Sequence, residues 1–287
     1  MAQAAWLLAL ACNFAPHLLI AALALLLIAL WRRQRLAIVC STVAACLTAT
    51  IVVHGLTVSD PRATRPDDAA KVRLMTFNIL YNNRDMPAVA RLIRRESPDI
   101  VVFQEFEPRQ KRALAPLAAG YPHRFGGHTM IWSRLPARRI EPRLIELPRW
   151  RHVLAEITTP DGEALRVLAT HMPRPIPLRR SRLQEDALGW SAVLSRAYSV
   201  DIAAGDFNAT RYMPRFRQFL RAAGLRAEPL GLATGTVPVW VPPPLGLHID
   251  HVLTGRCWRI ANRRTGSPAG SNHRPLIAEL VRAPGCS

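Results

Sequence analysis

The sequence predicts a layered α/β or α+β domain that follows an N-terminal membrane region. Residues 1–58 contain two long apolar stretches, whereas residues 71–287 contain short apolar runs with helix-like stretches between them. Many strands with interspersed helices indicate a layered domain built on two sheets or one large sheet. Residues 59–70 are polar, contain two prolines and lack periodicity. We therefore expect residues 59–70 to be a linker between the two parts.

Each apolar stretch is long enough to cross a bilayer, which needs about 20 apolar residues. The stretches cover residues 6–31 and 36–56, and the turn between them carries Arg32, Arg33 and Arg35. Positive charge in a short loop favours the cytoplasmic side of the membrane. A cleaved secretory signal would instead carry its charge before the apolar core. We expect a transmembrane helical hairpin in a bacterial inner membrane, with the following domain in the periplasm.

The charge and the cysteines restrict the partners and the compartment. The formal net charge is +18, and nearly all of the basic residues are arginine. A basic domain favours polyanions such as nucleic acid, anionic lipid head groups or phosphorylated small molecules, without choosing among them. Cys257 and Cys286 are the only cysteines after the hairpin. They could pair in an oxidising compartment, but their spacing leaves this open.

Eight short runs after the linker are typical of strands because they are rich in β-branched or aromatic residues. Three stretches between them have apolar residues at helical spacing. The predicted strands lie in residues 72–80, 99–106, 129–133, 152–158, 165–172, 200–209, 248–255 and 275–281, and the predicted helices in residues 85–97, 181–197 and 212–225.

Polar side chains stand at the ends of these predicted strands. Magnesium prefers oxygen ligands and is often held by only one or two carboxylates. A histidine of near-neutral pKa can move a proton, and Asn and His can donate to phosphoryl oxygens. The pattern therefore predicts a site for a hard cation and a phosphate. Its members are Asn78, Glu105, His171, Asp206, Asn208, Asp250 and His273.

Six short segments, in order, resemble the motif series of the endonuclease/exonuclease/phosphatase superfamily, which includes DNase I-like nucleases, sphingomyelinases and inositol polyphosphate phosphatases. The segments read "TFNIL", "PDIVVFQE", "ATHM", "GDFNAT", "HIDHVL" and "SNHRPL" and lie within residues 74–276. With its apolar front end, the chain most resembles the membrane-anchored bacterial members. The resemblance implies a DNase I-like two-sheet α/β sandwich over residues 71–287 and a site where the strand ends converge.

The resemblance also implies a role for each site residue. Glu105 would be the principal magnesium ligand, with Asn78 and Asp250 nearby, and Mn²⁺ is the alternative ion. Asp206 would orient or deprotonate the attacking water. Asn208 and His171 would hold the scissile phosphate, and His273 would act on the phosphate or the proton. The expected activity is Mg²⁺-dependent hydrolysis of phosphodiesters or phosphomonoesters in nucleic acid, phospholipid or a phosphorylated small molecule.

One position departs from the family pattern, which usually has Asp before the last His. This chain has Asn272 there. A carboxylate at that position would orient the imidazole and stabilise its cationic form, whereas Asn brings no charge. We expect Asn272 to reduce the activity or alter its pH dependence. The rival interpretation is a weakly active or inactive scaffold that binds a phosphate ligand.

Overall fold

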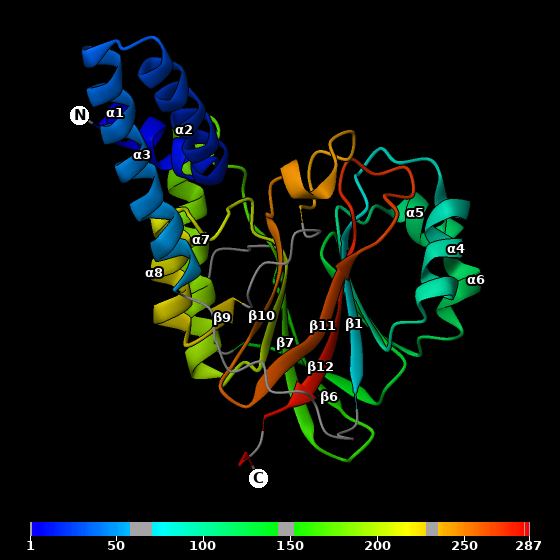
Figure 1. The fold of residues 1–287 in the computed structure, drawn as a ribbon. Coiled ribbons are helices and arrows are strands. Elements are labelled where there is room, and N and C mark those ends of the chain that lie inside the picture. The colour runs from blue at the N-terminus through cyan, green and yellow to red at the C-terminus, as the bar shows by residue number, and fades with distance from the viewer. Residues whose placement is uncertain (1, 58–70, 143–151, 228–234, 284, 287) are drawn as a thin grey trace.

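Two six-stranded sheets form the centre of the domain that follows the N-terminal region (Figure 1). The computed structural model describes residues 2–57, 71–142, 152–227, 235–283 and 285–286. The predicted linker at residues 59–70 therefore lies outside the described residues. One sheet has the strand order β11-β12-β1-β2-β4-β3 and the other β5-β6-β7-β8-β10-β9. The expected two-sheet α/β sandwich is confirmed.

The strands are β1 (Val72–Asn78), β2 (Ile100–Gln104), β3 (His123–Gly126), β4 (Met130–Ser133), β5 (Ala137–Ile140), β6 (Val153–Thr158), β7 (Ala164–His171), β8 (Ile202–Asp206), β9 (Arg226–Ala227), β10 (Asp250–Thr254), β11 (Trp258–Thr265) and β12 (Leu276–Arg282). The helices are α1 (Ala2–Cys12), α2 (Ala15–Trp31), α3 (Arg35–Leu56), α4 (Met86–Glu96), α5 (Pro108–Ala113), α6 (Ala115–Ala118), α7 (Leu178–Ala197) and α8 (Pro214–Ala223), with one short 3₁₀ turn η1 (Pro243–Leu245).

All eight predicted strands and all three predicted helices form. The strands β3, β5, β9 and β11 and the short helices α5 and α6 were not predicted from the sequence. The largest of these, β11, has the sequence "WRIANRRT" and alternates between half-buried and exposed residues at the edge of its sheet. The arginines of β11 interrupt its apolar pattern, because a strand with one solvated face lacks the continuous apolar run of a central strand.

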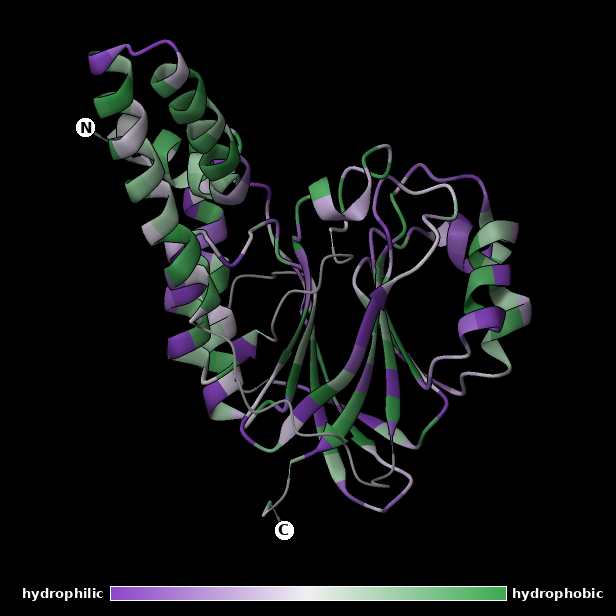
Figure 2. Cartoon of the chain, viewed as in Figure 1, coloured by the Kyte–Doolittle hydropathy of each residue, from purple (hydrophilic) through white to green (hydrophobic). Residues whose placement is uncertain are grey.

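Three apolar clusters build the core as layers. One lies between the sheets and includes Val102, Val167 and Val252. A second lies between β1 and β2 and the helix α4, and a third between the other sheet and the helices α7 and α8. Figure 2 shows the strands rich in hydrophobic residues and the outer faces of the flanking helices more hydrophilic. The central strands β2, β8 and β10 are therefore buried on both faces, as their apolar sequences require.

The pairing of the central strands brings the polar strand ends to one edge. β1 runs parallel to β2 with Asn78 opposite Gln104, and β7 runs parallel to β8 with His171 opposite Asp206. β10 runs antiparallel to β8, so that Asp250 at its start is also opposite Asp206. Carboxyl ends of parallel strands meet at one edge of a sheet, and an antiparallel neighbour begins there. This register therefore places the polar side chains at the strand ends together at one edge.

The N-terminal region (residues 2–57) is helical and lies beside α7 and α8 in Figure 1. Only α3, of 22 residues, is by itself long and apolar enough to span a membrane among the described residues. The predicted first span is broken: the segment Trp6–Cys12 meets Ala15–Trp31 at a bend of 83°. Asn13 and Pro16 explain the break, because the Asn13 side chain bonds outside the helix and Pro16 begins the new one.

A disulfide joins Cys257, next to β11, to Cys286 near the C-terminus, with a Cα–Cα distance of 5.5 Å. The pairing that the sequence left open is therefore present. It closes a loop of 29 residues around β11 and β12. Cross-links of this kind stabilise the folded state by restricting the unfolded chain.

Glu96 at the end of α4 is expected to contribute to stability through a buried ion pair. Its carboxylate is 4% exposed, contacts Arg264 of β11 and accepts a 3.1 Å hydrogen bond from Arg95 Nε. Burial alone would raise the pKa of Glu96, but the two guanidinium groups lower it. Because the folded state prefers the ionised form, this stabilisation is present above the unfolded-state pKa and disappears as the pH falls through the lower, folded-state pKa.

The Glu96→Gln variant should lose about 1–3 kcal/mol of unfolding free energy at pH 7, since two charged donors lose their acceptor. Denaturant unfolding at pH 7 and below pH 4 measures this loss, which should shrink at the lower pH. Glu279→Gln is the control, because the Glu279 carboxylate is 23% exposed and solvent weakens its pair with Arg73. Equal losses for the two variants at pH 7 would contradict the prediction.

Candidate active site

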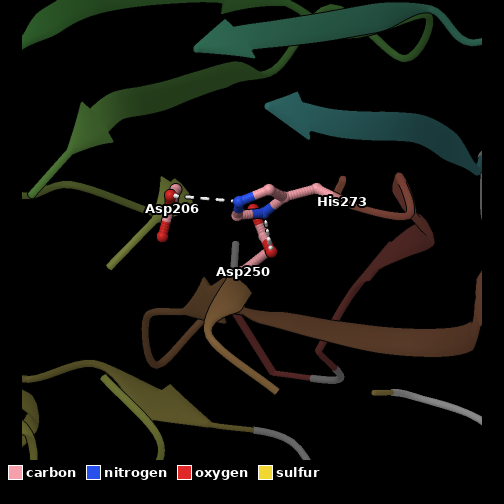
Figure 3. A group of neighbouring side chains, drawn as sticks. All are labelled: Asp206, Asp250 and His273. Carbon is pink, nitrogen blue, oxygen red and sulfur yellow. Dashed lines mark hydrogen bonds and ion pairs between the residues drawn. The ribbon is translucent and has the colours of Figure 1, made fainter. Parts of the chain in front are cut away.

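Asp206, Asp250 and His273 form a buried group between the ends of the two sheets (Figure 3). One possible ligand atom from each residue lies within 4.8 Å of those of the others. Asp206 ends β8, Asp250 begins β10, and His273 lies in the segment that leads into β12. Three distant stretches of sequence therefore place two carboxylates and an imidazole together.

Asp250 holds the imidazole of His273. His273 Nδ1 lies 2.8 Å from Asp250 Oδ2, and Nε2 points toward Asp206 Oδ2 at 3.9 Å. Burial alone would lower the pKa of His273, but the Asp250 carboxylate and its hydrogen bond raise it to about 9. The imidazole is therefore held in one orientation and favours its cationic form at neutral pH.

Asp206 is fully buried and accepts two hydrogen bonds. Oδ1 accepts from the backbone N–H of Asn208 at 2.8 Å, and Oδ2 accepts from Asn78 Nδ2 at 3.0 Å. Burial, together with the nearby Asp250 carboxylate, raises the pKa of Asp206 to about 7, against the opposing effect of His273. A carboxyl group with a pKa near neutrality is suited to exchange a proton with water.

Glu105 follows β2 and comes from the opposite sheet. Its Oε2 accepts from the backbone N–H of Tyr81 at 2.9 Å and its Oε1 from Asn78 Nδ2 at 3.2 Å. Burial would raise the pKa of Glu105, but these donors lower it. The backbone φ of Glu105 is +59°, an uncommon conformation for a residue with a side chain. Such strain often occurs at functional sites, and here the carboxylate shares the Asn78 amide with Asp206.

Asn78 links the two carboxylates. Its Nδ2 donates to both Glu105 and Asp206, while its Oδ1 accepts from the backbone N–H of Leu80 at 3.0 Å. The amide nitrogen therefore faces the carboxylates and the oxygen faces away from them. In this arrangement Asn78 orients the carboxylates, and direct ligation of a cation by its oxygen would require the amide to turn.

His171 ends β7 and completes the ring of site residues. Its Nε2 lies 3.8 Å from Glu105 Oε1 and 3.7 Å from Asp206 Oδ2. The ring stacks on that of His128, with centroids 5.5 Å apart, and His128 Nδ1 lies 3.0 Å from Glu107 Oε1. His171 thus lies between the carboxylates and the solvent-facing cleft.

Asn208 occupies the turn after β8 with a φ of +49°. Its Nδ2 donates to the backbone oxygen of Met172 at 2.9 Å, which ties the turn to the segment after His171. Just before this turn, Gly205 lets β8 lie close to β7, since a Cβ there would lie 1.9 Å from the backbone oxygen of Thr170. The structure brings all seven predicted residues to this one edge.

Asn272 does not orient the imidazole, contrary to our expectation. Its side chain is exposed, whereas the neighbouring His273 is buried. The carboxylate that contacts His273 Nδ1 is Asp250, which is 23 positions earlier in the chain. The turn at Ser271 causes this: its Oγ accepts from the backbone N–H of His273 and donates to the Asn78 oxygen. Side chains 272 and 273 then point to opposite sides.

The Asn272→Asp variant should therefore have kcat and KM within about 2-fold of the parent, as expected for a surface substitution away from buried partners. Its pH profile should also be unchanged, because His273 already has a carboxylate partner. Steady-state kinetics from pH 5 to 10 measure both quantities. A gain in rate above about 5-fold would restore a role for residue 272.

A cleft of about 620 Å³ leads to Glu105 and His171. Its wall includes Tyr81, Arg174 and Arg180, which the sequence analysis did not single out. Ser271 was missed as well, although its place in "SNH" two residues before His273 is a signal for a local side-chain turn. The arginines carried no recognisable signal because the chain contains so many of them.

The residues present fit a divalent cation. Glu105 from one sheet and Asp206 from the other accept hydrogen bonds from the same Asn78 amide, and Asp250 Oδ1 is buried without a hydrogen-bond partner among the described residues. A buried carboxylate oxygen without a partner is unfavourable unless an ion or water meets it. Oxygen-rich surroundings of this kind suit Mg²⁺ or Mn²⁺.

A family model described as "Endonuclease/Exonuclease/phosphatase family" matches residues 75–273, the stretch that contains all of these side chains. The chain belongs to this endonuclease/exonuclease/phosphatase family. It is accordingly a metal-dependent phosphoric ester hydrolase by family, with a buried Asp/Asp/His group that could hold the metal. Among curated proteins, no sequence matches the chain significantly.

Solved structures of the endonuclease/exonuclease/phosphatase family share the DNase I-like fold. A protein from Beutenbergia cavernae is 18% identical with a TM-score of 0.58, covering 75% of this chain and 72% of its own. A protein from Bacteroides vulgatus is 16% identical with a TM-score of 0.60, covering 75% and 100%. TDP2 from D. rerio, complexed with a single-strand DNA product, is 15% identical with a TM-score of 0.55, covering 75% and 99%.

Proposed function

We propose that the chain is a membrane-anchored, Mg²⁺-dependent phosphoesterase whose catalytic domain faces the periplasm. The observation that carries the chemistry is the buried Asp206, Asp250 and His273 group beside Glu105. Several kinds of support exist for the location. The helix α3 has a mean hydropathy of 2.4, large apolar side chains of α2 and α3 face outward, and a disulfide suits an oxidising compartment.

In the proposed mechanism Glu105 and the unpartnered Asp250 Oδ1 would hold the cation, with Asn78 orienting Glu105. When bound, the cation would supply charge stabilisation to the phosphoryl oxygens. Asp206 orients the attacking water and accepts its proton, for which a pKa of about 7 is suited. Cationic His273 donates a hydrogen bond to the phosphoryl group through Nε2. Asn208 and His171 would also hold the phosphate.

We propose a phosphate ester in a lipid head group as the substrate. Large apolar side chains are exposed in the segments that follow β7 and precede β10: Ile176 is 60% exposed, Trp240 83% and Leu245 55%. Exposed aromatic and aliphatic groups of this kind are suited to a membrane interface. Arg174 and Arg180 line the cleft and would attract an anionic head group.

Nucleic acid is the second candidate substrate. The net charge of +18 favours a polyanion, and the structurally similar TDP2 was solved with a single-strand DNA product. A phosphorylated small molecule would undergo the same chemistry without contacting the exposed apolar side chains or requiring the large net charge.

A substrate panel tests the proposed function with the full chain in detergent or nanodiscs. The substrates are bis-nitrophenyl phosphate, single-stranded DNA and phospholipid vesicles, each with Mg²⁺ or EDTA. We expect metal-dependent turnover, highest on vesicles. Faster turnover of DNA would replace the lipid assignment, and no turnover on any substrate would favour the scaffold interpretation.

The topology has a separate test. A phosphatase reporter fused at the C-terminus folds to an active enzyme only after export. The proposal predicts an active fusion, and an inactive reporter would place the domain in the cytoplasm.

A further inference from the structure

The N-terminal region contacts three loops that surround the site. Trp6 Nε1 donates to the backbone oxygen of Pro175 at 2.8 Å, and His17 Nε2 lies 2.9 Å from the backbone oxygen of Leu245. Between them, Asn13 Oδ1 accepts from the backbone N–H and Oγ1 of Thr210, at 2.8 and 3.1 Å. These loops follow β7, precede β10 and follow β8, the strands that carry His171, Asp250 and Asp206.

Asn13 makes the most buried of these contacts. It is 7% exposed and Thr210 is 2% exposed, so water has little access to their hydrogen bonds. Asn13 Nδ2 donates to the Leu10 oxygen at 3.3 Å, which directs Oδ1 toward the loop. The break between α1 and α2 makes this geometry available, since Asn13 lies outside both helices. Losing the acceptor would leave a buried N–H unsatisfied, an outcome that proteins avoid.

Thr210 is two residues after Asn208, in the short loop between β8 and α8. Three hydrogen bonds hold Asn208 at the start of this loop. Its backbone N–H donates to Asp206, and its side chain donates to the backbone oxygen of Met172. Its backbone oxygen accepts from Gln184 Nε2 at 3.0 Å. Asn13 holds the middle of the loop. Because Asn208 has a strained φ, its position depends on constraints from both sides.

The end of α3 contacts the same loop. Gly55 packs against the ring of Tyr212, where a Cβ would lie 2.3 Å from Cδ1. Both ends of the N-terminal region therefore meet the segment 210–212. A simple membrane tether would not need such contacts.

We propose that Asn13 is a positioning residue for the active site, and that the N-terminal region is a structural part of the catalytic unit. Asn13 fixes the loop that carries Asn208 and thereby the donor that meets the phosphate. The activity readout of this inference depends on the proposed phosphoesterase function, whereas its exchange readout does not.

The test compares Asn13→Leu, Asn13→Asp and Thr50→Val in the full chain in nanodiscs. Asn13→Leu removes the acceptor, whereas Asn13→Asp keeps an oxygen at the same place. Thr50→Val is the control, because Thr50 Oγ1 donates to the backbone oxygen of Cys46 within α3. We expect Asn13→Leu to lower kcat roughly 10-fold or more, as small misplacements of reacting groups do. Asn13→Asp should recover to within about 3-fold of the parent.

A general loss of folding would not give this pattern. The Mg²⁺ concentration for half-maximal rate should stay within about 2-fold in Asn13→Leu, because the proposed cation ligands Glu105 and Asp250 lie outside the loop that Asn13 contacts. Hydrogen exchange of residues 207–213 should accelerate in Asn13→Leu and not in Thr50→Val. Unchanged kcat and unchanged exchange in folded Asn13→Leu would overturn the inference. If no variant or parent hydrolyses any substrate, the proposed function fails and the exchange measurement still decides this inference.

A second experiment applies if Asn13→Leu does not fold. A protease site is inserted within residues 59–70 of the otherwise unchanged chain, and the linker is cut after purification. We expect residues 1–57 to remain bound to the catalytic domain and the parental exchange of residues 207–213 to persist. Separation of the two parts without any change in exchange would overturn the inference.

Discussion

Replacement of Asp206 by Asn is expected to lower kcat/KM by about 10³-fold, within the range for loss of a positioned proton acceptor. The change preserves shape and retains an oxygen for the Asn208 N–H, which now lies 2.8 Å from Oδ1. It removes the negative charge that lies between His171 and His273. The reason for the loss is chemical, because an amide cannot accept the proton of the attacking water.

Asp201→Asn is the matched control for this prediction. Asp201 stands beside the opposite end of β8 and accepts a 2.9 Å hydrogen bond from the Arg166 N–H. The same substitution there should change kcat/KM by less than about 3-fold, since it is remote from the site. Thermal melting shows whether both variants fold. A folded Asp206→Asn variant with more than a tenth of the parental rate would refute the assignment.

Replacement of Asp250 by Asn is expected to lower kcat by about 10²–10⁴-fold, by analogy with the loss of a histidine-orienting carboxylate in serine proteases. Asp250 Oδ2 holds His273 Nδ1 at 2.8 Å, and an amide can present its nitrogen instead. The variant also removes the main cause of the raised pKa of His273, which is about 9 in the parent.

The pH profile separates this effect from loss of fold. With burial no longer opposed by Asp250, the pKa of His273 should fall. If cationic His273 acts on the phosphate, the parent keeps its activity up to about pH 9 and the variant loses its residual activity at a lower pH. The log of kcat/KM against pH, from 5 to 10, measures the shift. An alkaline limb at the same pH in both proteins would show that Asp250 does not set the charge of His273.

Much of the site could be predicted because polar residues at the ends of apolar strands have few structural roles. Glu105, His171 and Asp206 each follow such a strand, and the parallel pairs β1–β2 and β7–β8 bring their ends to one edge. The order of the sheets and the short edge strands could not be predicted in the same way. Their pairing depends on contacts between distant segments, and their own sequences are short or rich in arginine.

The partner of His273 could not be identified from neighbouring residues. Sequence adjacency pointed to Asn272, whereas the antiparallel register of β10 with β8 delivers Asp250. The Ser271 turn then rotates residue 272 to the surface. The contact of Asn13 with Thr210 was hidden for a similar reason, since 197 positions separate the two residues.

The most direct measurement of the central claim is the binding of Mn²⁺, a paramagnetic substitute for Mg²⁺, to the full chain and to Glu105→Gln. Electron paramagnetic resonance gives the dissociation constant without any substrate. If strand ends of both sheets share one cation, Glu105→Gln should weaken binding by about 10–100-fold, as loss of a ligand or its close support does. Equal Mn²⁺ affinity in the two proteins, or no binding to the parent, would contradict a metal site at this edge.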